Sequence, residues 1–386
     1  MKRIIGGPSG GLLAGKMVTR FLLAVLLGGL GLAGWKTVQA VPAAQRGPYT
    51  VYLPLVQRTE EQSGPAIYST SYYIKSISID PVSGLDQLAY SRGCELGARD
   101  KDLAGTQLNL AILDYGRPIY DQINGTSQYG ARLFTTAARV DLNQIAVSAR
   151  SFAVGYYVCT GVDTASRLIV GIGTNNLEYD GCSNCSVTYG HGQAWAGMVN
   201  AVNDWLVQNG YGGQVSAAGA NDIELSWNSA ANTRTWLEGY DSANRFEMYN
   251  FGALPGCPYF DAPGAQCGGT NPFDNPLTHY KWSLEEVWYT IWGSPPVFPV
   301  PEIYSNNGVN AQQWYLMSVY AYNTHGLAVT FRGVMTQMQA CQQVSGDPTC
   351  EYLDNTPEEG WNQLQTLVNG NANTAHPILY STDIRW

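Results

Sequence analysis

Apolar and polar positions form an alternating series of short apolar runs and longer amphipathic segments, which begins near residue 85. Several runs are continuously apolar, which is typical of parallel strands buried on both faces. We therefore predict strands at residues 108–114, 167–173, 214–220, 245–249, 297–303, 327–331 and 378–380.

Helical spacing of apolar residues fills the gaps between these runs. In residues 191–208, for example, Trp195, Met198, Val202 and Leu206 fall on one stripe, and Gly210 follows as a C-terminal cap. The same criterion predicts helices at residues 142–157, 191–208, 233–240, 284–292, 311–323 and 357–368.

Alternating strands and helices indicate an α/β fold with a mostly parallel sheet and right-handed crossovers. About seven such units favour a (β/α) TIM-type barrel, either complete or lacking one strand. A Rossmann-type sheet is the alternative. It requires G-x-G-x-x-G after the first strand, where this chain has Tyr115-Gly116-Arg117-Pro118.

The N-terminal segment has the pattern of an export signal. The apolar run at residues 21–33 follows a basic leader and precedes the small-x-small sequence Val38-Gln39-Ala40. The run is shorter than the ~20 residues of a membrane span, although an uncleaved anchor remains the alternative. We predict a signal peptide at residues 1–40, a linker and N-terminal extension at 41–84, and the barrel domain at 85–386.

Composition narrows the choice of partners. Charged residues make up 13% of the chain, about half the usual ~25%, and the net charge is −9. No Lys/Arg cluster follows the leader, which argues against nucleic-acid binding. The 25 Tyr and 11 Trp residues offer flat rings that suit sugar faces, and equally suit ordinary cores.

The eight cysteines all follow the leader, as expected for a disulfide-bonded exported protein. Spacing suggests the pairs Cys182–Cys185, Cys257–Cys267, Cys341–Cys350 and Cys94–Cys159, with other pairings left open. Cys182 and Cys185 also have the spacing of half a zinc site or a redox pair. A zinc site would require a second ligand pair of similar spacing, which the chain lacks.

Polar side chains gather where the predicted strands end, which is where barrel enzymes place their chemistry. Asp222 and Glu224 follow the third predicted strand, and alternate residues of an extended chain point the same way. Glu302 ends the fifth. Their alternative roles are helix capping or pairing with Arg234 for the first two, and an ordinary loop carboxylate for Glu302.

Two carboxylates across a barrel mouth are what glycoside hydrolysis requires, one protonated and one ionised. We predict Glu224 and Glu302 as this pair, with Asp222 raising the pKa of Glu224 through its charge. A separation above ~12 Å would exclude the pair. Predicted substrate contacts are Asp114, Asn175, Asn176, Trp227, Tyr249, Asn250, Tyr304 and Arg332.

Other chemistries find no matching motif. The four histidines, at positions 191, 279, 325 and 376, form no HExxH spacing, so we predict no metal. The chain after the leader has no G-x-S-x-G elbow and no P-loop, and we predict no cofactor. Asp114 and Glu247 could alternatively be structural, Asp114 by pairing with Arg117 or Arg332.

With these strand-end acids, the chain resembles exported (β/α)-barrel glycoside hydrolases over residues 85–386. Chitinase-type barrels carry D-x-x-D-x-D-x-E on the fourth strand, whereas this chain has only the D-x-E step, on the third predicted strand. The segments 112–116, 173–176 and 219–224 also resemble exported bacterial proteins with no assigned activity.

We therefore expect a secreted or cell-envelope protein that cleaves glycosidic bonds in a polysaccharide or cell-wall glycan. No membrane span is expected after signal removal. Two alternatives stay open: a glycan-binding protein without catalysis, and a structural envelope protein whose strand-end acids form salt bridges.

Overall fold

Eight parallel strands form the centre of the fold, in the order β11-β8-β7-β6-β2-β1-β13-β12. The computed structural model describes residues 68–123, 125–178, 185–255, 257, 266–267, 280–345, 350 and 355–386. The strands are β1 (Ser69–Tyr73), β2 (Leu108–Asp114), β6 (Arg167–Asn175), β7 (Val215–Asp222), β8 (Met248–Asn250), β11 (Val297–Pro299), β12 (Gly333–Thr336) and β13 (Tyr380–Arg385).

The two outer strands, β11 and β12, approach each other and nearly close the sheet into a barrel. Glu302 and Met335 form a parallel bridge just beyond β11. The Met335 amide donates to the Pro301 carbonyl at 2.9 Å, and the Ile303 amide donates to the Met335 carbonyl at 2.8 Å. The predicted fold class, an α/β barrel of the TIM type, is confirmed.

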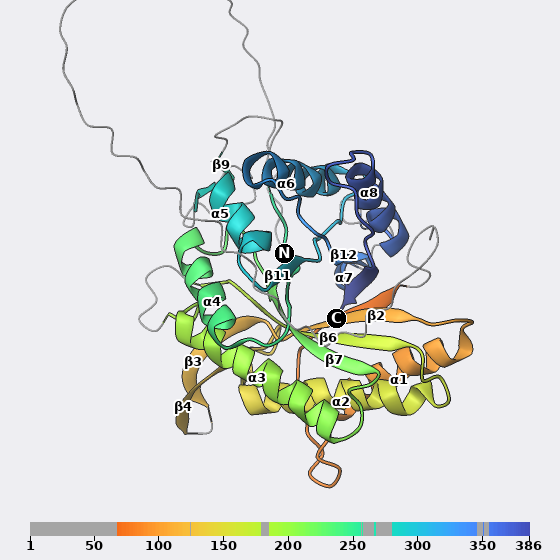
Figure 1. Ribbon diagram of the computed structural model, residues 1–386. Helices are drawn as coiled ribbons and strands as arrows, with labels where there is room; N and C mark the ends of the chain where they lie inside the picture. The colour runs from red at the N-terminus through yellow and green to blue at the C-terminus, as the bar shows by residue number, and fades with distance from the viewer. Residues whose placement is uncertain are drawn as a thin grey trace, which may run out of the picture. The chain divides into compact units, whose positions relative to one another are not determined.

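Helices alternate with the strands and follow one another around them (Figure 1). They are α1 (Gln87–Asp102), α2 (Leu142–Thr160), α3 (Tyr189–Gln208), α4 (Ala230–Ala243), α5 (Leu284–Trp288) with the π-helix η1 (Tyr289–Gly293), α6 (Val309–His325), α7 (Met338–Ser345) and α8 (Pro357–Asn369). Side-chain caps define where several begin: Asp141 with Gln144 forms a capping box for α2, and Thr356 with Glu359 forms one for α8.

Two small antiparallel sheets interrupt this alternation. The first joins β3 (Arg117–Ile123), β4 (Thr126–Arg132) and β5 (Arg139–Asp141) between β2 and α2. The second pairs β9 (Gln266–Cys267) with β10 (Trp282–Ser283). Sequence reading predicted neither sheet, nor helices α1 and α7.

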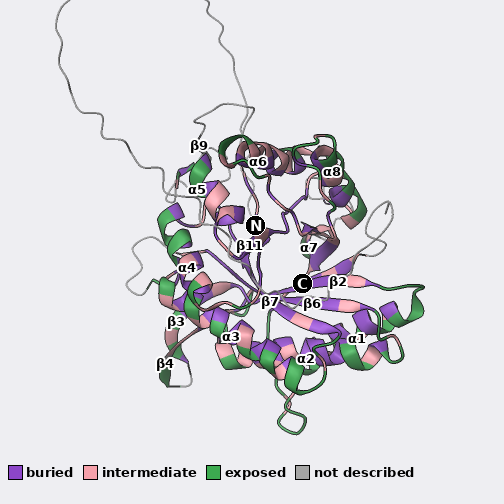
Figure 2. Cartoon of the chain, viewed as in Figure 1, coloured by how far each residue is buried: buried purple, intermediate pink, exposed green. Residues whose placement is uncertain are grey.

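Apolar side chains form two layers, one inside the barrel and one between barrel and helices. Strand β2 shows the division: Leu110 and Ile112 belong to the inner cluster, whereas Ala111 and Leu113 belong to the outer one. This alternation follows from the strand period of two. Figure 2 shows the burial along the strands and on the helix faces that cover them.

Helices α1 and α2 pack closely and are also linked covalently. A Cβ atom at Gly93 would overlap with the backbone oxygen of Phe152, so only glycine permits this approach. The disulfide Cys94–Cys159 joins the same two helices.

Two of the four predicted disulfides are confirmed, Cys94–Cys159 and Cys341–Cys350. Cys185 and Cys257 are also disulfide-bonded, but the predicted pairings with Cys182 and Cys267 involve side chains outside the described part of the chain. Stable disulfides are typical of an oxidising compartment.

Two strand predictions were misplaced. Residues 327–331 and 378–380 were predicted as strands, but the strands are β12 and β13, a few residues further on. Val329, Phe331 and Ile378 are buried in the outer cluster instead, because a short apolar run marks burial without specifying which segment pairs.

Strand β1 lies within residues 41–84, the range predicted as linker and N-terminal extension. Polar residues hide both β1 and β13 from a search for apolar runs. Ser71 and Thr382 are buried, and their hydroxyl oxygens lie 2.8 Å apart, so each satisfies the other.

With β1 opening the barrel, β7 is its fourth strand in chain order rather than the third. None of the described helices is long and apolar enough to cross a membrane. The predicted signal peptide lies outside the described residues and stays a prediction.

Candidate active site

Three carboxylates meet at the carboxyl ends of the barrel strands. Asp222 is the last residue of β7, Glu224 follows two residues later, and Glu302 lies three residues beyond β11. One oxygen of each carboxylate lies within 4.8 Å of the others. Asp222 and Glu302 are buried, and Glu224 is half-buried. The predicted pair Glu224 and Glu302 therefore meets its distance condition.

Asn176, in the loop after β6, fixes the segment that carries two of these acids. Its backbone amide donates to the Asp222 carbonyl at 3.2 Å. Its side-chain amide donates to the Glu224 carbonyl and accepts from the Glu224 amide, both at 3.0 Å. Asn176 is fully buried, and its two side-chain hydrogen bonds fix the position of the Glu224 backbone.

The Glu224 carboxylate is also positioned from β8. Its Oε1 accepts a hydrogen bond from the Ala253 amide at 2.8 Å. A hydrogen bond from a backbone amide stabilises the charged form of a carboxylate.

Asp114, the last residue of β2, is a fourth acid at this end of the barrel and has no exposed surface. Its Oδ1 accepts from the Gly116 amide at 2.8 Å, whereas Oδ2 has no hydrogen-bond partner among the described residues. Burial raises the pKa of Asp114 from 3.8 to about 7.

Burial and mutual repulsion raise the pKa values of Asp222 and Glu302 well above the ordinary range. For Asp222 the largest cause is burial, followed by the charges of Glu302, Glu224 and Asp114. For Glu302 it is again burial, followed by the charge of Glu224. The raised pKa values favour the protonated forms of these acids, and the protons belong to the cluster as a whole.

Two tyrosines lie against the acids and remain protonated. Burial first, and then the charge of Glu302, raises the pKa values of Tyr73 and Tyr304 well above 10. Tyr73 donates to Gln337 Oε1 at 3.3 Å. The Tyr304 hydroxyl lies beside Glu302 but makes no hydrogen bond of regular geometry within the described residues.

A pocket of about 350 Å³ opens next to Asp222. Its walls come from the ends of β1, β7, β12 and β13, from the loop after β4 and from helix α7. The lining residues are Tyr73, Phe134, Asp222, Trp227, Gln337, Ala340, Cys341, Val344 and Trp386. Of the predicted substrate contacts, Trp227 is thereby placed in a concave site.

Two other predicted contacts are at strand ends but bond within their own turns. Asn175 Oδ1 accepts from the Leu177 amide at 3.1 Å, and Asn250 Oδ1 accepts from the Gly252 amide at 3.0 Å. The Asn250 side-chain nitrogen has no partner among the described residues, so it retains a donor for a ligand.

Arg332 and Tyr249 are not brought to this cluster. Arg332, just before β12, forms an ion pair with Glu247, just before β8, and the Tyr249 hydroxyl donates to Glu247 at 3.1 Å. These contacts hold the amino end of the barrel together, and we do not assign Arg332 or Tyr249 to the site. Glu247 has the structural role that sequence reading gave as its alternative.

Sequence reading missed Tyr73, Gln337, Phe134 and Trp386. Tyr73 is the last residue of β1, which was not recognised, and Trp386 follows β13, whose predicted position was wrong. A period-two pattern that included buried Ser and Thr would have been the signal for both strands.

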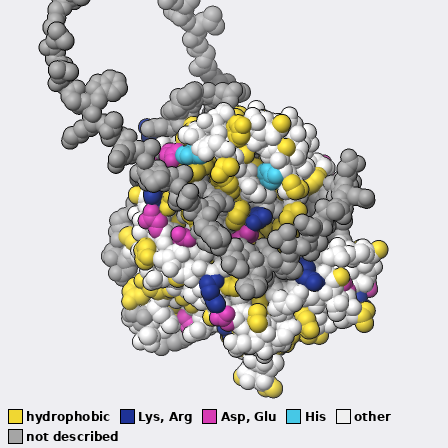
Figure 3. Space-filling model, viewed as in Figure 1, with side chains coloured by type: hydrophobic (Ala, Val, Ile, Leu, Met, Phe, Trp, Pro, Cys, Tyr) yellow, Lys and Arg dark blue, Asp and Glu magenta, His cyan; other side chains and the backbone are white. Residues whose placement is uncertain are grey.

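Three carboxylate oxygens are also donors that hard divalent cations prefer. Such an ion would have to displace the protons that burial holds on Asp222 and Glu302. Removal of divalent cations therefore decides between a protonated cluster and a metal-bound one. On the face shown in Figure 3, Lys and Arg side chains of the described residues stand apart from one another, without the basic stripe that a nucleic-acid backbone requires.

Comparison with known protein families finds no match for this chain, and comparison with curated protein sequences finds no significant match. A barrel alone does not define an activity, so the chemistry of the carboxylate cluster has to carry the functional assignment.

Proposed function

We propose that this protein is a glycoside hydrolase in which Glu224 and Glu302 act as the catalytic pair. The observation that carries the proposal is the approach of the Asp222, Glu224 and Glu302 oxygens to within 4.8 Å at the carboxyl end of the barrel. Carboxyl groups ~5 Å apart are characteristic of retaining glycosidases, and wider pairs of inverting ones. Contact between acid oxygens is what direct attack by one carboxylate requires, and we propose the retaining mechanism.

The environments of the two acids divide their roles. Glu302 is buried, and its raised pKa keeps a proton on it, as a general acid requires. Glu224 is less buried and accepts a hydrogen bond from a backbone amide, which suits a charged nucleophile. Asp222 lies beside both acids and on the lining of the adjoining pocket, where its carboxyl group can meet a substrate hydroxyl.

In the first step the glycosidic C–O bond breaks, the Glu302 proton passes to the leaving oxygen, and a Glu224 oxygen bonds to the anomeric carbon. In the second step water attacks that carbon, gives its proton to Glu302 and releases Glu224. Each acid thus returns to its starting state.

Export remains part of the proposal. The two disulfides support an oxidising compartment, and the predicted leader would deliver the protein there. We propose a polysaccharide or a cell-wall glycan as the polymer that it meets outside the cell.

Glycan binding without turnover is the second candidate, because the abundant Tyr and Trp residues offer flat rings that suit sugar faces. A purely structural role finds less support. It would need Arg–carboxylate pairs at the mouth, and within the described residues Asp114, Asp222 and Glu302 form no ion pair with Lys or Arg.

Reducing-sugar release from a panel of polysaccharides and wall preparations tests the proposal. The native protein is compared with Glu302→Gln and with Glu285→Gln, a control at an exposed acid on α5. We expect Glu302→Gln to lose ~100- to 10,000-fold in rate and the control to lose less than about twofold. Binding without release by the native protein would favour the second candidate.

A further inference from the structure

The pocket beside Asp222 has walls that are almost entirely apolar. Three aromatic rings form one wall: the Tyr73 ring centroid lies 4.5 Å from that of Trp386 and 5.0 Å from that of Phe134, and Phe134 and Trp386 meet edge to face at 5.6 Å. Such mutual contacts hold the rings in place. The pocket is therefore a formed surface rather than a gap between mobile side chains.

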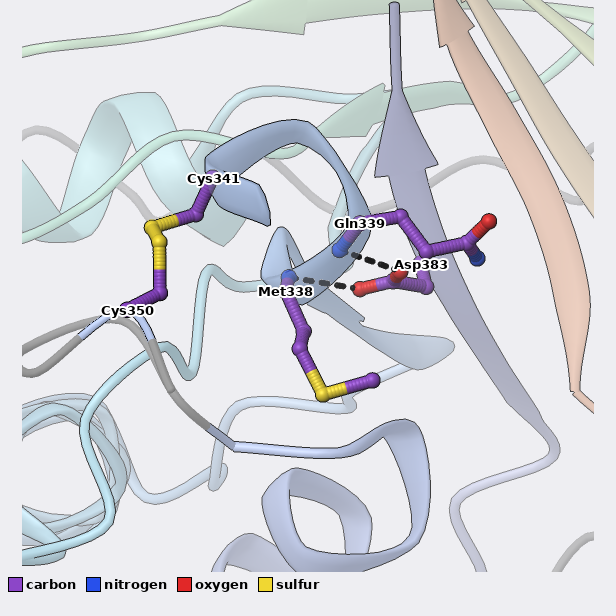
Figure 4. Close-up of a disulfide and its surroundings, with 5 residues drawn as sticks. All are labelled: Met338, Gln339, Cys341, Cys350 and Asp383. Carbon is purple, nitrogen blue, oxygen red and sulfur yellow. Dashed lines mark hydrogen bonds between the residues drawn. A yellow bond between two sulfur atoms is a disulfide. The ribbon is translucent and has the colours of Figure 1, made fainter. Parts of the chain in front are cut away.

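The opposite wall is helix α7, which contributes Ala340, Cys341 and Val344. Asp383 of β13 accepts hydrogen bonds from the first amides of this helix, those of Met338 and Gln339, at 2.9 and 3.0 Å. The disulfide Cys341–Cys350 ties the helix a second time. Figure 4 shows both restraints around α7, which explain how so short a helix can form a fixed wall.

Few lining groups can bond a polar ligand. Gln337 Oε1 already accepts the Tyr73 hydroxyl. Its Nε2 and the indole N–H groups of Trp227 and Trp386 are the lining donors, and Asp222, 5% exposed, is the acid on the lining. An aromatic ring against these walls buries no hydroxyl, whereas each sugar hydroxyl turned toward them loses its water at a cost of ~1–3 kcal/mol.

We propose that this pocket binds a planar aromatic alcohol of one or two fused rings, with its oxygen at Asp222 and its rings against Tyr73 and Trp386. Its volume, about 350 Å³, falls within the ~300–1,000 Å³ typical of small-molecule sites. Resting on the proposed function, the alcohol is the leaving group of an aryl glycoside, which narrows the substrate from any polysaccharide to a glycan that carries an aromatic group at the bond to be cleaved; its oxygen lies beside the acid cluster that supplies the proton.

Direct binding of 2-naphthol, followed by calorimetry, tests the pocket without requiring turnover. Cellobiose serves as a polar probe with two rings. We expect saturable binding of 2-naphthol and at least ~10-fold weaker binding of cellobiose at the same site.

Matched variants test whether 2-naphthol binds in this pocket. Val344→Asp puts a charge on the pocket wall at a position that is 72% exposed, and Val207→Asp makes the same change on α3 at 70% exposure. We expect Val344→Asp to weaken 2-naphthol binding at least ~10-fold and Val207→Asp to change it less than about twofold. Trp386→Ala provides a second variant with the same expected loss.

The outcomes separate the pocket from the catalytic proposal. Binding of 2-naphthol that Val344→Asp weakens, together with no hydrolysis of naphthyl glycosides, would uphold the pocket and contradict the glycosidase. Sugar release from polysaccharides without 2-naphthol binding would uphold the glycosidase and contradict the pocket. Tighter binding of cellobiose, or equal effects of the two Val→Asp changes, would overturn the inference.

Discussion

Replacing Asp114 by Asn tests the electrostatics of the acid cluster directly. Burial raises the pKa of Asp114 from 3.8 to about 7, so above about pH 4 the folded protein keeps a proton that the unfolded chain releases. A rise of about three units corresponds to about 4 kcal/mol. This contribution to the free energy of unfolding is complete below pH 4 and is lost as the pH rises through 7.

The Asn side chain preserves shape and one contact, since its oxygen can still accept from the Gly116 amide. Its NH₂ group occupies the place of Oδ2, which has no partner among the described residues. That cost does not change with pH, so the informative quantity is how the stability difference between the variant and the native protein changes with pH. We expect the stability difference to move in favour of the variant by about 4 kcal/mol between pH 4 and pH 8.

Urea unfolding followed by Trp fluorescence, at intervals of half a pH unit with the disulfides intact, supplies these free energies. Asp102→Asn, at an exposed position of α1, serves as the control for the Asp-to-Asn exchange itself. Parallel stability curves for the native protein and Asp114→Asn would refute the reasoning.

Three further predictions concern other parts of the fold and site. His191 donates from Nε2 to the Gly130 carbonyl and accepts from Trp236 at Nδ1, and burial lowers its pKa from 6.5 to about 4. We therefore expect the free energy of unfolding to fall by about 3 kcal/mol as the pH falls from 6.5 to 4. In urea unfolding His191→Gln should remove this dependence on pH, and an unchanged dependence would contradict the assignment. Asn176→Ala releases the Glu224 peptide and should lower the free energy of unfolding by ~1–3 kcal/mol and also lower turnover. The control Asn200→Ala, which also breaks hydrogen bonds to two backbone groups, should lower stability alone. Equal losses of turnover in the two variants would contradict a positioning role for Asn176. Dialysis against a chelator should leave glycoside hydrolysis within about twofold, because protons neutralise Asp222 and Glu302, and activity restored only by a divalent cation would show that the cluster is a metal site.

Much of the fold was predictable because its central strands are continuously apolar. Strands β2 and β6 begin where the apolar runs begin. Strand β1 was not recognised and β13 was misplaced, since the residues that they bury include Ser71 and Thr382, which satisfy each other only when the two strands pair.

The candidate site was predictable in part for a similar reason. Strand-end carboxylates mark the mouth of a barrel, so Asp222, Glu224 and Glu302 could be named in advance. The aromatic wall could not, because Tyr73 and Trp386 meet only when β1 pairs with β13. Arg332 was misplaced because its predicted strand ends where the actual strand, β12, begins, which moves its side chain to the opposite end of the barrel.

The division of roles between Glu302 and Glu224 is the central claim, and leaving-group dependence tests it most directly. Aryl glycosides of one sugar are compared, one with a strongly acidic phenol and one with a simple alcohol as leaving group. If Glu302 is the acid, Glu302→Gln keeps activity on the acidic phenol within about tenfold and loses ~100- to 10,000-fold on the alcohol, whereas Glu224→Gln loses both. Equal losses on both substrates for Glu302→Gln would contradict this assignment.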